Sequence, residues 1–357
     1  APAQTAEWYL TAHNTVDNTF IHDGGLVFRA ACGVFLGGSA SFNRITHNEI
    51  CDLSWMGVHL GWSWTGRSPA YTHHNEVGYN HIHHIGNGVL NDIGGIYTLG
   101  VSPGTVLHHN RIHDVTRFER GRDGYGGWGI YLDAGSSEIT VANNVVYDTR
   151  DGGLHLHCYA YPFGDVVTNN IFAFSQDAEL IRNAVMENEA RHVTLERNIV
   201  YGPSTKTYGG GNWKKGSNFS ADRNLFWSTS TNAPVFAGRT FADWQAGGCD
   251  RGGRIADPGF VDAAARDFRL KPGSPAFALG FAPLDSTPAG LYGDPRWVRL
   301  AQTARHRAYE AAVAPAKDRA LRHGFEEEDA GDLPDEARVF EENTQAVVRV
   351  VAAGVAG

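Results

Sequence analysis

The sequence has little of what several protein classes require. It contains only 4 cysteines, at positions 32, 51, 158 and 249, and no Cys-x-x-Cys pair. This pattern predicts neither a zinc ribbon nor a dithiol redox site. The cysteines are expected to be small core residues, and a disulfide between Cys32 and Cys51 is an open alternative.

Positive charge and long apolar runs are also scarce. Lys and Arg total 30 against 39 Asp and Glu, the formal net charge is −9, and no basic cluster offers a face for phosphates. These features argue against nucleic acid as the main partner. The absence of any run of 18 apolar residues predicts no membrane span. The opening, APAQTAEWYL, has no Met and no charged-then-apolar leader, as expected of a fragment or a processed protein.

Glycine, by contrast, is abundant, and methionine is almost missing. The chain has 43 Gly and 2 Met among 357 residues, together with many asparagines and aromatic residues. This composition favours strands and tight turns over helices. Apolar residues make up 42% of the chain, which is enough for a sizeable core.

An asparagine-centred repeat runs through most of the sequence. Its copies are THNEICD (46–52), GYNHIHH (78–84), HHNRIHD (108–114), ANNVVYD (142–148), TNNIFAF (168–174), ERNIVYG (196–202) and DRNLFWS (222–228). The shared residues are Asn48, Asn80, Asn110, Asn144, Asn170, Asn198 and Asn224, with Thr19 in the same slot of an earlier copy. Each Asn is expected to tolerate left-handed backbone in a turn and to pair with its copies above and below.

Two apolar columns accompany the repeat. Two residues after each Asn stand Ile50, Ile82, Ile112, Val146, Phe172, Val200 and Phe226. A second column alternates in GVFLG (33–37), GVHLG (57–61), GIYTL (95–99), GIYLD (129–133) and GLHLH (153–157). Because side chains alternate along a strand, every second residue of these segments faces the interior and the residues between them face outward. Repeats of this length without helical periodicity predict an all-β fold, a right-handed parallel β-helix.

The composition changes toward the C-terminus. We expect the β-helix to cover residues 1–290 and to lack its N-terminal coils. Residues 291–323 are rich in Ala, Arg and Lys and predict a helical linker or cap. Residues 324–357 are too few for a core of their own. They resemble the start of a laminin-G-like β-sandwich.

The outward side of the second column carries aromatic and polar residues, namely His59, Tyr97, Tyr131 and His155. Long turns at 61–74 and 116–128 would add Trp62, Trp64, Arg122, Tyr125 and Trp128 beside them. Long loops beyond the needs of a repeat are usually functional. We therefore predict a groove in which these side chains bind a sugar; the alternative is that the outward rings only pack beneath covering loops.

Two carboxylates belong to this region. Asp92 precedes the strand in DIGGIYTLGVSPG (92–104), whereas Asp133 follows it in GGWGIYLDAGSS (126–137). Cleavage of a glycosidic bond needs such a pair, one acid and one nucleophile or base. Each Asp could instead cap a turn. Glu119 and Asp123 are substitutes for Asp92, and His157 lies in the column of Asp133.

The alignment of the two coils raises a difficulty. Matching Gly95 to Gly129 sets Asp92 level with Gly126, seven residues before Asp133. At about 3.3 Å per residue, straight strands would hold the carboxylates too far apart to share one bond. The pairs Gly94–Gly95 and Gly126–Gly127 would have to bend the chain inward.

Three phrases together resemble the right-handed β-helix proteins related to glycoside hydrolase family 141. They are DIGGIYTLGVSPGTVLHHNRIHDV, GGWGIYLDAGSSEITVANNVVYDT and GGLHLHCYAYPFGDVVTNNIFAFS, and the resemblance covers roughly residues 10–285. It implies a glycosidase, with α-L-fucosidase and xylanase activities among its members, and two catalytic aspartates at Asp92 and Asp133. The substrate would be an oligo- or polysaccharide. It does not imply a particular sugar.

Other functions stay open. A β-helix polysaccharide lyase would use a Lys or Arg base with calcium-bridged carboxylates, whereas the coils hold little Lys and no calcium-ligand spacing. A non-catalytic carbohydrate-binding or adhesin β-helix would keep the aromatic face without needing Asp133. His155 and His157 are expected to contact substrate hydroxyls rather than a metal, and no cofactor is predicted. A polysaccharide substrate implies an extracellular or periplasmic location.

Overall fold

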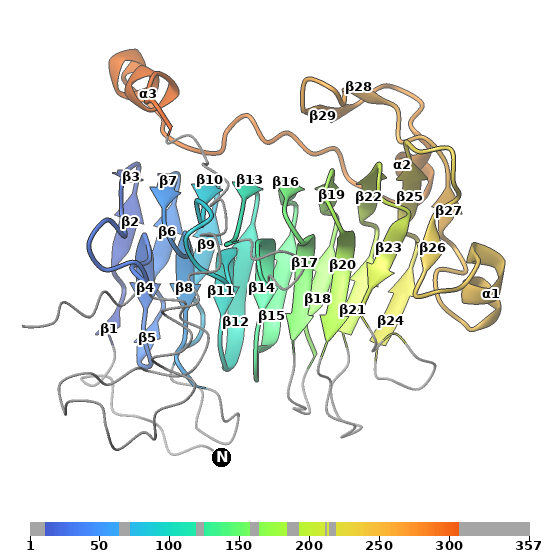
Figure 1. The fold of residues 1–357 in the computed structure, drawn as a ribbon, viewed down its shortest axis with the longest axis horizontal. Helices are drawn as coiled ribbons and strands as arrows, with labels where there is room; N and C mark the ends of the chain where they lie inside the picture. Colours follow the sequence, from blue (N-terminus) through green and yellow to red (C-terminus); the bar gives the residue numbers. More distant parts are fainter. Residues whose placement is uncertain are drawn as a thin grey trace, which may run out of the picture.

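The computed structural model describes residues 11–63, 72–118, 125–157, 164–183, 193–210, 213 and 219–306, and parallel strands dominate it (Figure 1). Sheet 1 comprises β2 (Thr15–Asp17), β6 (Arg44–Thr46), β9 (Glu76–Gly78), β12 (Val101–His108), β15 (Ser137–Ala142), β18 (Val166–Thr168), β21 (Val193–Glu196) and β24 (Phe219–Asp222). Sheet 2 comprises β3 (Phe20–His22), β7 (Glu49–Leu53), β10 (His81–Ile85), β13 (Arg111–Val115), β16 (Val145–Thr149), β19 (Ile171–Ala173), β22 (Ile199–Gly202), β25 (Leu225–Ser228) and β27 (Arg254–Ile255). Sheet 3 comprises β4 (Val34–Leu36), β8 (Val58–Leu60), β11 (Gly94–Thr98), β14 (Trp128–Leu132), β17 (Gly152–His157), β20 (Ala178–Asn183), β23 (Lys206–Gly209) and β26 (Val235–Phe236).

Successive coils add one strand to each sheet, so the chain is a parallel β-helix, as the sequence predicts. The predicted inward residues pair in register in sheet 2, from Ile50 beside Ile82 to Val200 beside Phe226. Each is almost fully buried. The same holds in sheet 3, where Ile96 pairs with Val58 and Ile130. One apolar side chain per strand and coil therefore builds a continuous interior core.

The asparagines form the predicted ladder between sheets 1 and 2. The backbone N–H and the side-chain amide of Asn110 both donate to Asn144 Oδ1, each at 3.0 Å, and Asn144 donates in the same way to Asn170. We expected the Asn itself to have left-handed backbone. Instead, the residue before it does, such as His109 with φ 51°. With the left-handed backbone at the preceding residue, the side-chain amide of the Asn stays aligned with the amides of the neighbouring coils.

The ladder ends at Asp250. Asn224 donates to Asp250 Oδ1, while Trp244 Nε1 donates to Oδ2 at 2.9 Å. Trp244 is fully buried and belongs to α1 (Phe241–Ala246), which begins at the N-cap Thr240 and packs on the last coil. Figure 1 shows α1 at the end of the stack next to β26 and β27. The last coil is thus closed by one short helix and one carboxylate.

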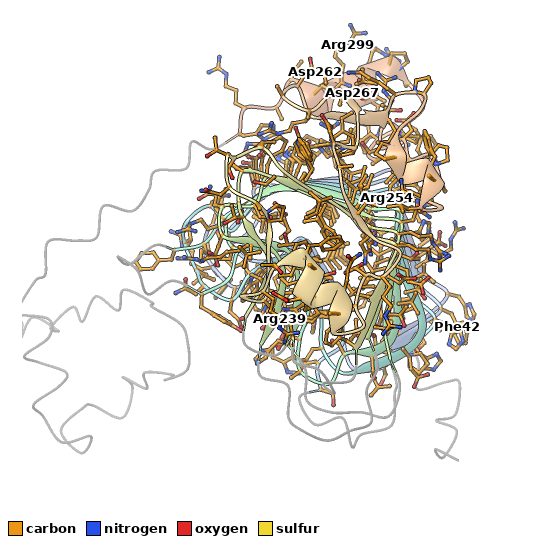
Figure 2. The ribbon with its side chains drawn as sticks, turned by 90° about the vertical axis from the view of Figure 1, so that its right-hand side faces the viewer. Phe42, Arg239, Arg254, Asp262, Asp267 and Arg299 are labelled. Atoms are coloured by element: carbon orange, nitrogen blue, oxygen red, sulfur yellow. The ribbon has the colours of Figure 1, made fainter. Side chains whose placement is uncertain are left out.

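Residues 256–306, here called the strap, turn back along the outside of sheet 2. They contain β28 (Phe260–Asp262), its antiparallel partner β29 (Asp267–Leu270), α2 (Pro275–Ala278) and α3 (Pro295–Gln302). Figure 1 shows the strap passing above sheet 2 to α3, near β3 and β7, and Figure 2 shows Asp262, Asp267 and Arg299 on one side of the coils. Phe260 and Phe268 pack there against the outward residues Val145 and Ile171. α3 lies within the segment 291–323 predicted to be helical, whereas residues 307–357 lie outside the described residues.

Smaller features complete the fold. β1 (Thr11–Ala12) and β5 (Ala40–Ser41) form a separate parallel pair. Cys51 is buried and Cys32 half-buried, and both are free thiols, so the alternative of a disulfide between them is wrong. Cys158 lies outside the described residues. Within those residues, no helix combines the length and the apolar character needed to cross a bilayer.

Candidate active site

The outward column of sheet 3 forms one stack of rings. His59 pairs with Phe35 and Tyr97 in neighbouring strands, and Tyr131 pairs with Tyr97 and His155, as the alternation predicts. Ring centroids are 4.5 Å apart for His59 and Tyr97, 4.9 Å for Tyr97 and Tyr131, and 4.7 Å for Tyr131 and His155. This spacing is that of adjacent parallel strands.

Most of this column is shielded from solvent. His59 and His155 are 0% exposed, and Tyr131 and Tyr97 are 1% and 4% exposed. These four rings are therefore not the open face that we expected, and the alternative of packing beneath other residues describes them. Aromatic rings at the edge of the stack remain available to a ligand, since Trp62 is 48% and Phe35 52% exposed.

Asp133 follows the last residue of β14 and points into the ring column. The Tyr97 hydroxyl donates to Asp133 Oδ2, and His157 Nδ1 lies 2.8 Å from Asp133 Oδ1. His157 Nδ1 also lies 3.3 Å from the Tyr131 hydroxyl. Asp133 is only 6% exposed, so these contacts replace the hydrogen bonds that water would make to its carboxylate.

Asp92 lies just before β11, where the backbone turns. Its φ is 60°, its N–H donates to the Tyr125 carbonyl at 2.7 Å, and its carbonyl accepts from Trp55 Nε1 at 3.3 Å. Gly126 packs directly on this turn, because a Cβ there would lie 2.5 Å from the Asp92 nitrogen. A glycine is required at 126 both by this approach and by its φ of 117°.

The two carboxylates nevertheless influence each other despite the offset along the strands, since the charge of Asp133 raises the pKa of Asp92. Tyr131, which comes from the coil that carries Asp133, lies close enough to the Asp92 carboxyl to lower its pKa. Tyr97, from the coil of Asp92, bonds Asp133 in return. The backbone turns at Asp92, Gly126 and Gly127, whose φ values are 60°, 117° and 83°, whereas Gly94 and Gly95 lie within the strand β11.

The electrostatics of the pair are unequal. Burial, and then the charge of Asp133, raise the pKa of Asp92 to about 6, against the lowering effect of the Tyr131 hydrogen bond. A carboxyl with such a pKa holds its proton near neutral pH far more often than an ordinary aspartate. Burial and the neighbouring aspartates also raise the pKa of the Tyr97 and Tyr131 phenols, which therefore stay neutral donors.

Several polar atoms here are buried without a hydrogen-bond partner. Among the described residues, Asp92 Oδ1, Trp128 Nε1 and both ring nitrogens of His155 have no hydrogen-bond partner. Trp128 and His155 are in ring contact, with centroids 3.9 Å apart. Buried polar groups are normally bonded. Their concentration around Asp92 and Asp133 makes this region the candidate site.

A cavity of about 470 Å³ opens at the coils of β4 and β8, and neither Asp92 nor Asp133 lines it. Its lining consists of Ala30, Ala31, Cys32, Phe35, Gly37, Gly38, Trp55, His59 and Trp62. Trp55 links it to Asp92 through a hydrogen bond, and His59 links it to Tyr97 by ring contact. Trp55 and Cys32 are outside the repeat columns, so no periodic signal points to either residue.

The remaining predicted residues divide into two groups. Trp64, Arg122, Glu119 and Asp123 lie outside the described residues. The second group lies around the ring column and consists of Trp62, Trp128 and His157. The ring centroids of Trp62 and His59 are 5.3 Å apart. Within the described part of the chain, His155 and His157 are not among the sets of three potential metal ligands, which lie on sheet 2.

No protein-family model matches the sequence, and no curated protein is significantly similar to it. Similar solved structures include the following three. A glycoside hydrolase has 28% identity and a TM-score of 0.39, over 45% of this chain and 26% of its own. Pectate lyase Pel9A has 14% identity and a TM-score of 0.42, over 69% of this chain and 67% of its own. The cedar pollen allergen jun a 1 has 14% identity and a TM-score of 0.32, over 79% of each chain.

The chain therefore spans about a quarter of the length of the glycoside hydrolase that it matches. With TM-scores below 0.5, these similarities carry no argument about function. The parallel β-helix rests on the sheets of this chain, and the candidate site rests on its own side chains.

Proposed function

We propose that this protein is a glycoside hydrolase that cuts plant or microbial polysaccharide with Asp92 and Asp133. The observation that carries the proposal is that two carboxylates from neighbouring coils, Asp133 buried and Asp92 half-buried, interact across one column of tyrosines. Glycosidic cleavage needs a pair of carboxyl groups with different roles.

Asp92 suits the role of the general acid. Its pKa of about 6 keeps a proton available near neutral pH, and its buried Oδ1 has no partner within the described residues. A proton on this oxygen can pass to the departing glycosidic oxygen, which would otherwise leave as an unstable alkoxide. The proton lowers the energy of the transition state because the leaving oxygen does not develop a full negative charge.

Asp133 suits the role of the nucleophile or of the base that activates water. Both roles need a carboxylate, and its two oxygens face a phenol donor and an imidazole nitrogen. These neighbours orient the group and leave it in place while charge develops on the sugar ring. His157 also contacts the Tyr131 hydroxyl, which ties the two halves of the site together.

The cavity at the coils of β4 and β8 suits a sugar ring. Its aromatic walls Phe35, Trp55 and Trp62 offer faces on which the C–H groups of a pyranose pack. Trp128 and His155, whose nitrogen atoms have no hydrogen-bond partner among the described residues, lie buried on the other side of the column. A relationship to glycoside hydrolase family 141, and a location outside the cytoplasm, are part of this proposal.

Hydrolysis assays on aryl glycosides and plant glycans test it, with wild type, Asp92→Asn and Asp133→Asn. Both variants are expected to lose at least about 100-fold in kcat/KM with the fold intact by circular dichroism. Asp23→Asn is the matched control, since Asp23 also has left-handed backbone but is exposed and remote from the site. It should keep wild-type activity.

Two outcomes would contradict the proposal. Unsaturated products that absorb in the ultraviolet would make the protein a lyase, although none of the described residues that we place in the site is Lys or Arg. Binding of glycans without turnover would make it a carbohydrate-binding protein. Either result would leave the ring column as a binding surface only.

A further inference from the structure

A second cluster of chemically active side chains lies on the outer face of sheet 2. Glu49 of β7 pairs with His81 of β10, and the next outward residue of β10 is His83. Glu49 Oε1 lies 2.9 Å from His81 Nδ1 and 2.8 Å from His83 Nε2. Three potential ligand atoms from two neighbouring strands therefore converge on one point.

The cluster is enclosed by the protein. Glu49 is 7% and His83 3% exposed. Gly290 of the strap lies directly over it, because a Cβ at this residue would be 2.8 Å from Glu49 Oε2 and 3.1 Å from His81 Cβ. The Gly290 N–H donates to the Tyr79 carbonyl at 2.8 Å and fixes the strap there. The strap thus covers Glu49 and His83, and Gly290 places no side chain among them, while His81 stays half-buried.

We propose that Glu49, His81 and His83 bind a divalent transition-metal ion of the zinc type. One carboxylate oxygen and two imidazole nitrogens are a donor set that zinc prefers, and three protein ligands leave a fourth position open. With metal bonds of about 2.0–2.1 Å, tetrahedral ligands are about 3.3 Å apart. Small side-chain rotations from the observed 2.8 and 2.9 Å would admit the ion.

The surroundings of His81 support this assignment. His81 Nε2 lies 2.8 Å from His113 Nε2, and His113 Nδ1 lies 2.6 Å from Asp114 Oδ2. With His113 donating from Nδ1 to Asp114, its Nε2 accepts the Nε2–H of His81. His81 Nδ1 is then free of a proton in the neutral ring and can bind metal. Metal-binding histidines commonly have such an orienting partner on the other ring nitrogen.

A competing ligand set shares one member of the cluster. Cys51, His83 and His306 also bring three ligand atoms within 4.8 Å of one another. His306 follows α3 and already has a close carboxylate partner, since its Nδ1 lies 2.9 Å from Asp52 Oδ2. The set with Glu49 is favoured because its two nitrogens already face the same oxygen.

Titration of the full chain with metal tests the proposal. After treatment with a chelator, calorimetry with ZnCl₂ is expected to show one ion per chain, and CoCl₂ is expected to give visible bands of a four-coordinate site without a thiolate band. Glu49→Gln, His81→Gln and His83→Gln should each weaken zinc binding by at least about 100-fold. His113→Gln, which alters only the orienting partner, should weaken it by about 10–100-fold.

His108→Gln is the matched control, since His108 Nε2 also lies near a carboxylate, 3.2 Å from Glu76 Oε1, but on sheet 1. It should bind zinc as the wild type does. Absence of zinc binding by the wild type would overturn the proposal even if a variant failed to fold. So would equal affinity in all variants, and a cobalt–thiolate band would assign the ion to Cys51 instead.

Discussion

At the scale of single residues, two tyrosines determine how the two candidate catalytic aspartates differ. Tyr97 donates to Asp133, which also has an imidazole nitrogen at 2.8 Å. Asp92 has the Tyr131 contact, and its Oδ1 has no partner among the described residues. Asp133 thus has a phenol donor and an imidazole beside it, whereas Asp92 has a raised pKa, and this difference separates the two chemical roles that we propose.

This difference predicts the alkaline limb of the pH profile. Because Asp92 must carry its proton to act as the acid, kcat/KM should fall as the pH rises through about 6, the raised pKa of Asp92. Asp92→Asn should abolish that limb along with most of the activity. An activated aryl glycoside, whose leaving group needs no proton, should restore turnover in this variant; failure of such rescue would contradict the role of acid.

A buried carboxyl outside the site predicts a pH effect on stability. Glu179 is 2% exposed, and its oxygens accept from the Ser175 N–H at 2.8 Å and from the Ser175 hydroxyl at 2.6 Å. Burial raises the pKa of Glu179 to about 7. The folded state therefore binds this proton more tightly than the unfolded chain does.

The stabilisation from Glu179 is complete below the unfolded pKa of about 4.5 and is lost as the pH rises through the folded pKa of about 7. Each tenfold difference in proton affinity between the two states corresponds to about 1.4 kcal/mol. Glu179→Gln keeps the shape and cannot ionise. Urea unfolding at pH 5 and pH 8 should show a smaller drop in unfolding free energy for the variant than for the wild type. An equal drop in both proteins would contradict this assignment.

At the scale of the elements, the asparagine ladder joins each coil to the next. Asn144 donates to Asn170 Oδ1 and to the Leu107 carbonyl, both at 2.9 Å, and accepts from Asn110. All of these groups are buried. The side chain therefore connects three coils, and its loss leaves donors and an acceptor without partners on both sides.

Asn144→Ala is expected to lower the free energy of unfolding by about 3 kcal/mol, since each buried group left unpaired costs about 1–3 kcal/mol. Asn232→Ala is the control, because Asn232 is exposed in the turn between β25 and β26. Denaturant unfolding followed by circular dichroism measures both. A loss no larger than that of the control would mean that water replaces the ladder at little cost.

The ladder also shows how much of this molecule the sequence reveals. Columns such as Asn110 with Asn144, or Tyr97 with Tyr131, could be aligned from spacing alone, because every coil repeats the same constraints. The turn at Asp92 could not, since it depends on contacts made once, with Tyr125, Trp55 and Gly126. Periodicity thus predicts the scaffold, whereas the site departs from periodicity.

At the scale of the whole molecule, the strap makes the outer face of sheet 2 a second core. Phe268 is 4% exposed and has ring contacts with Tyr147 at 5.3 Å and Phe260 at 5.2 Å. Arg266 adds a two-pronged ion pair with Asp148, at 2.7 Å for each bond. The apolar outward residues of sheet 2 are in this way kept from solvent.

Phe268→Ala should therefore cost about 3–5 kcal/mol of unfolding free energy and increase binding of a hydrophobic dye, because it opens a cavity between strap and sheet. Phe277→Ala is the matched control on the same strap, since Phe277 is 37% exposed. Thermal and urea unfolding measure the difference. Equal losses in the two variants would show that the strap is not anchored through Phe268.

The carboxylate at the end of the ladder gives the solenoid a direction of growth. In each step of the ladder the asparagine donates hydrogen bonds to the next residue. Asp250 accepts them from Asn224, and its ionised carboxylate has no hydrogen to donate further. If a further coil followed Asp250, the ionised side chain of Asp250 could not donate a hydrogen bond to the asparagine of that coil. Gene duplications that lengthen this protein are thus expected to be accepted between existing coils, upstream of Asp250, so that the same terminator is kept.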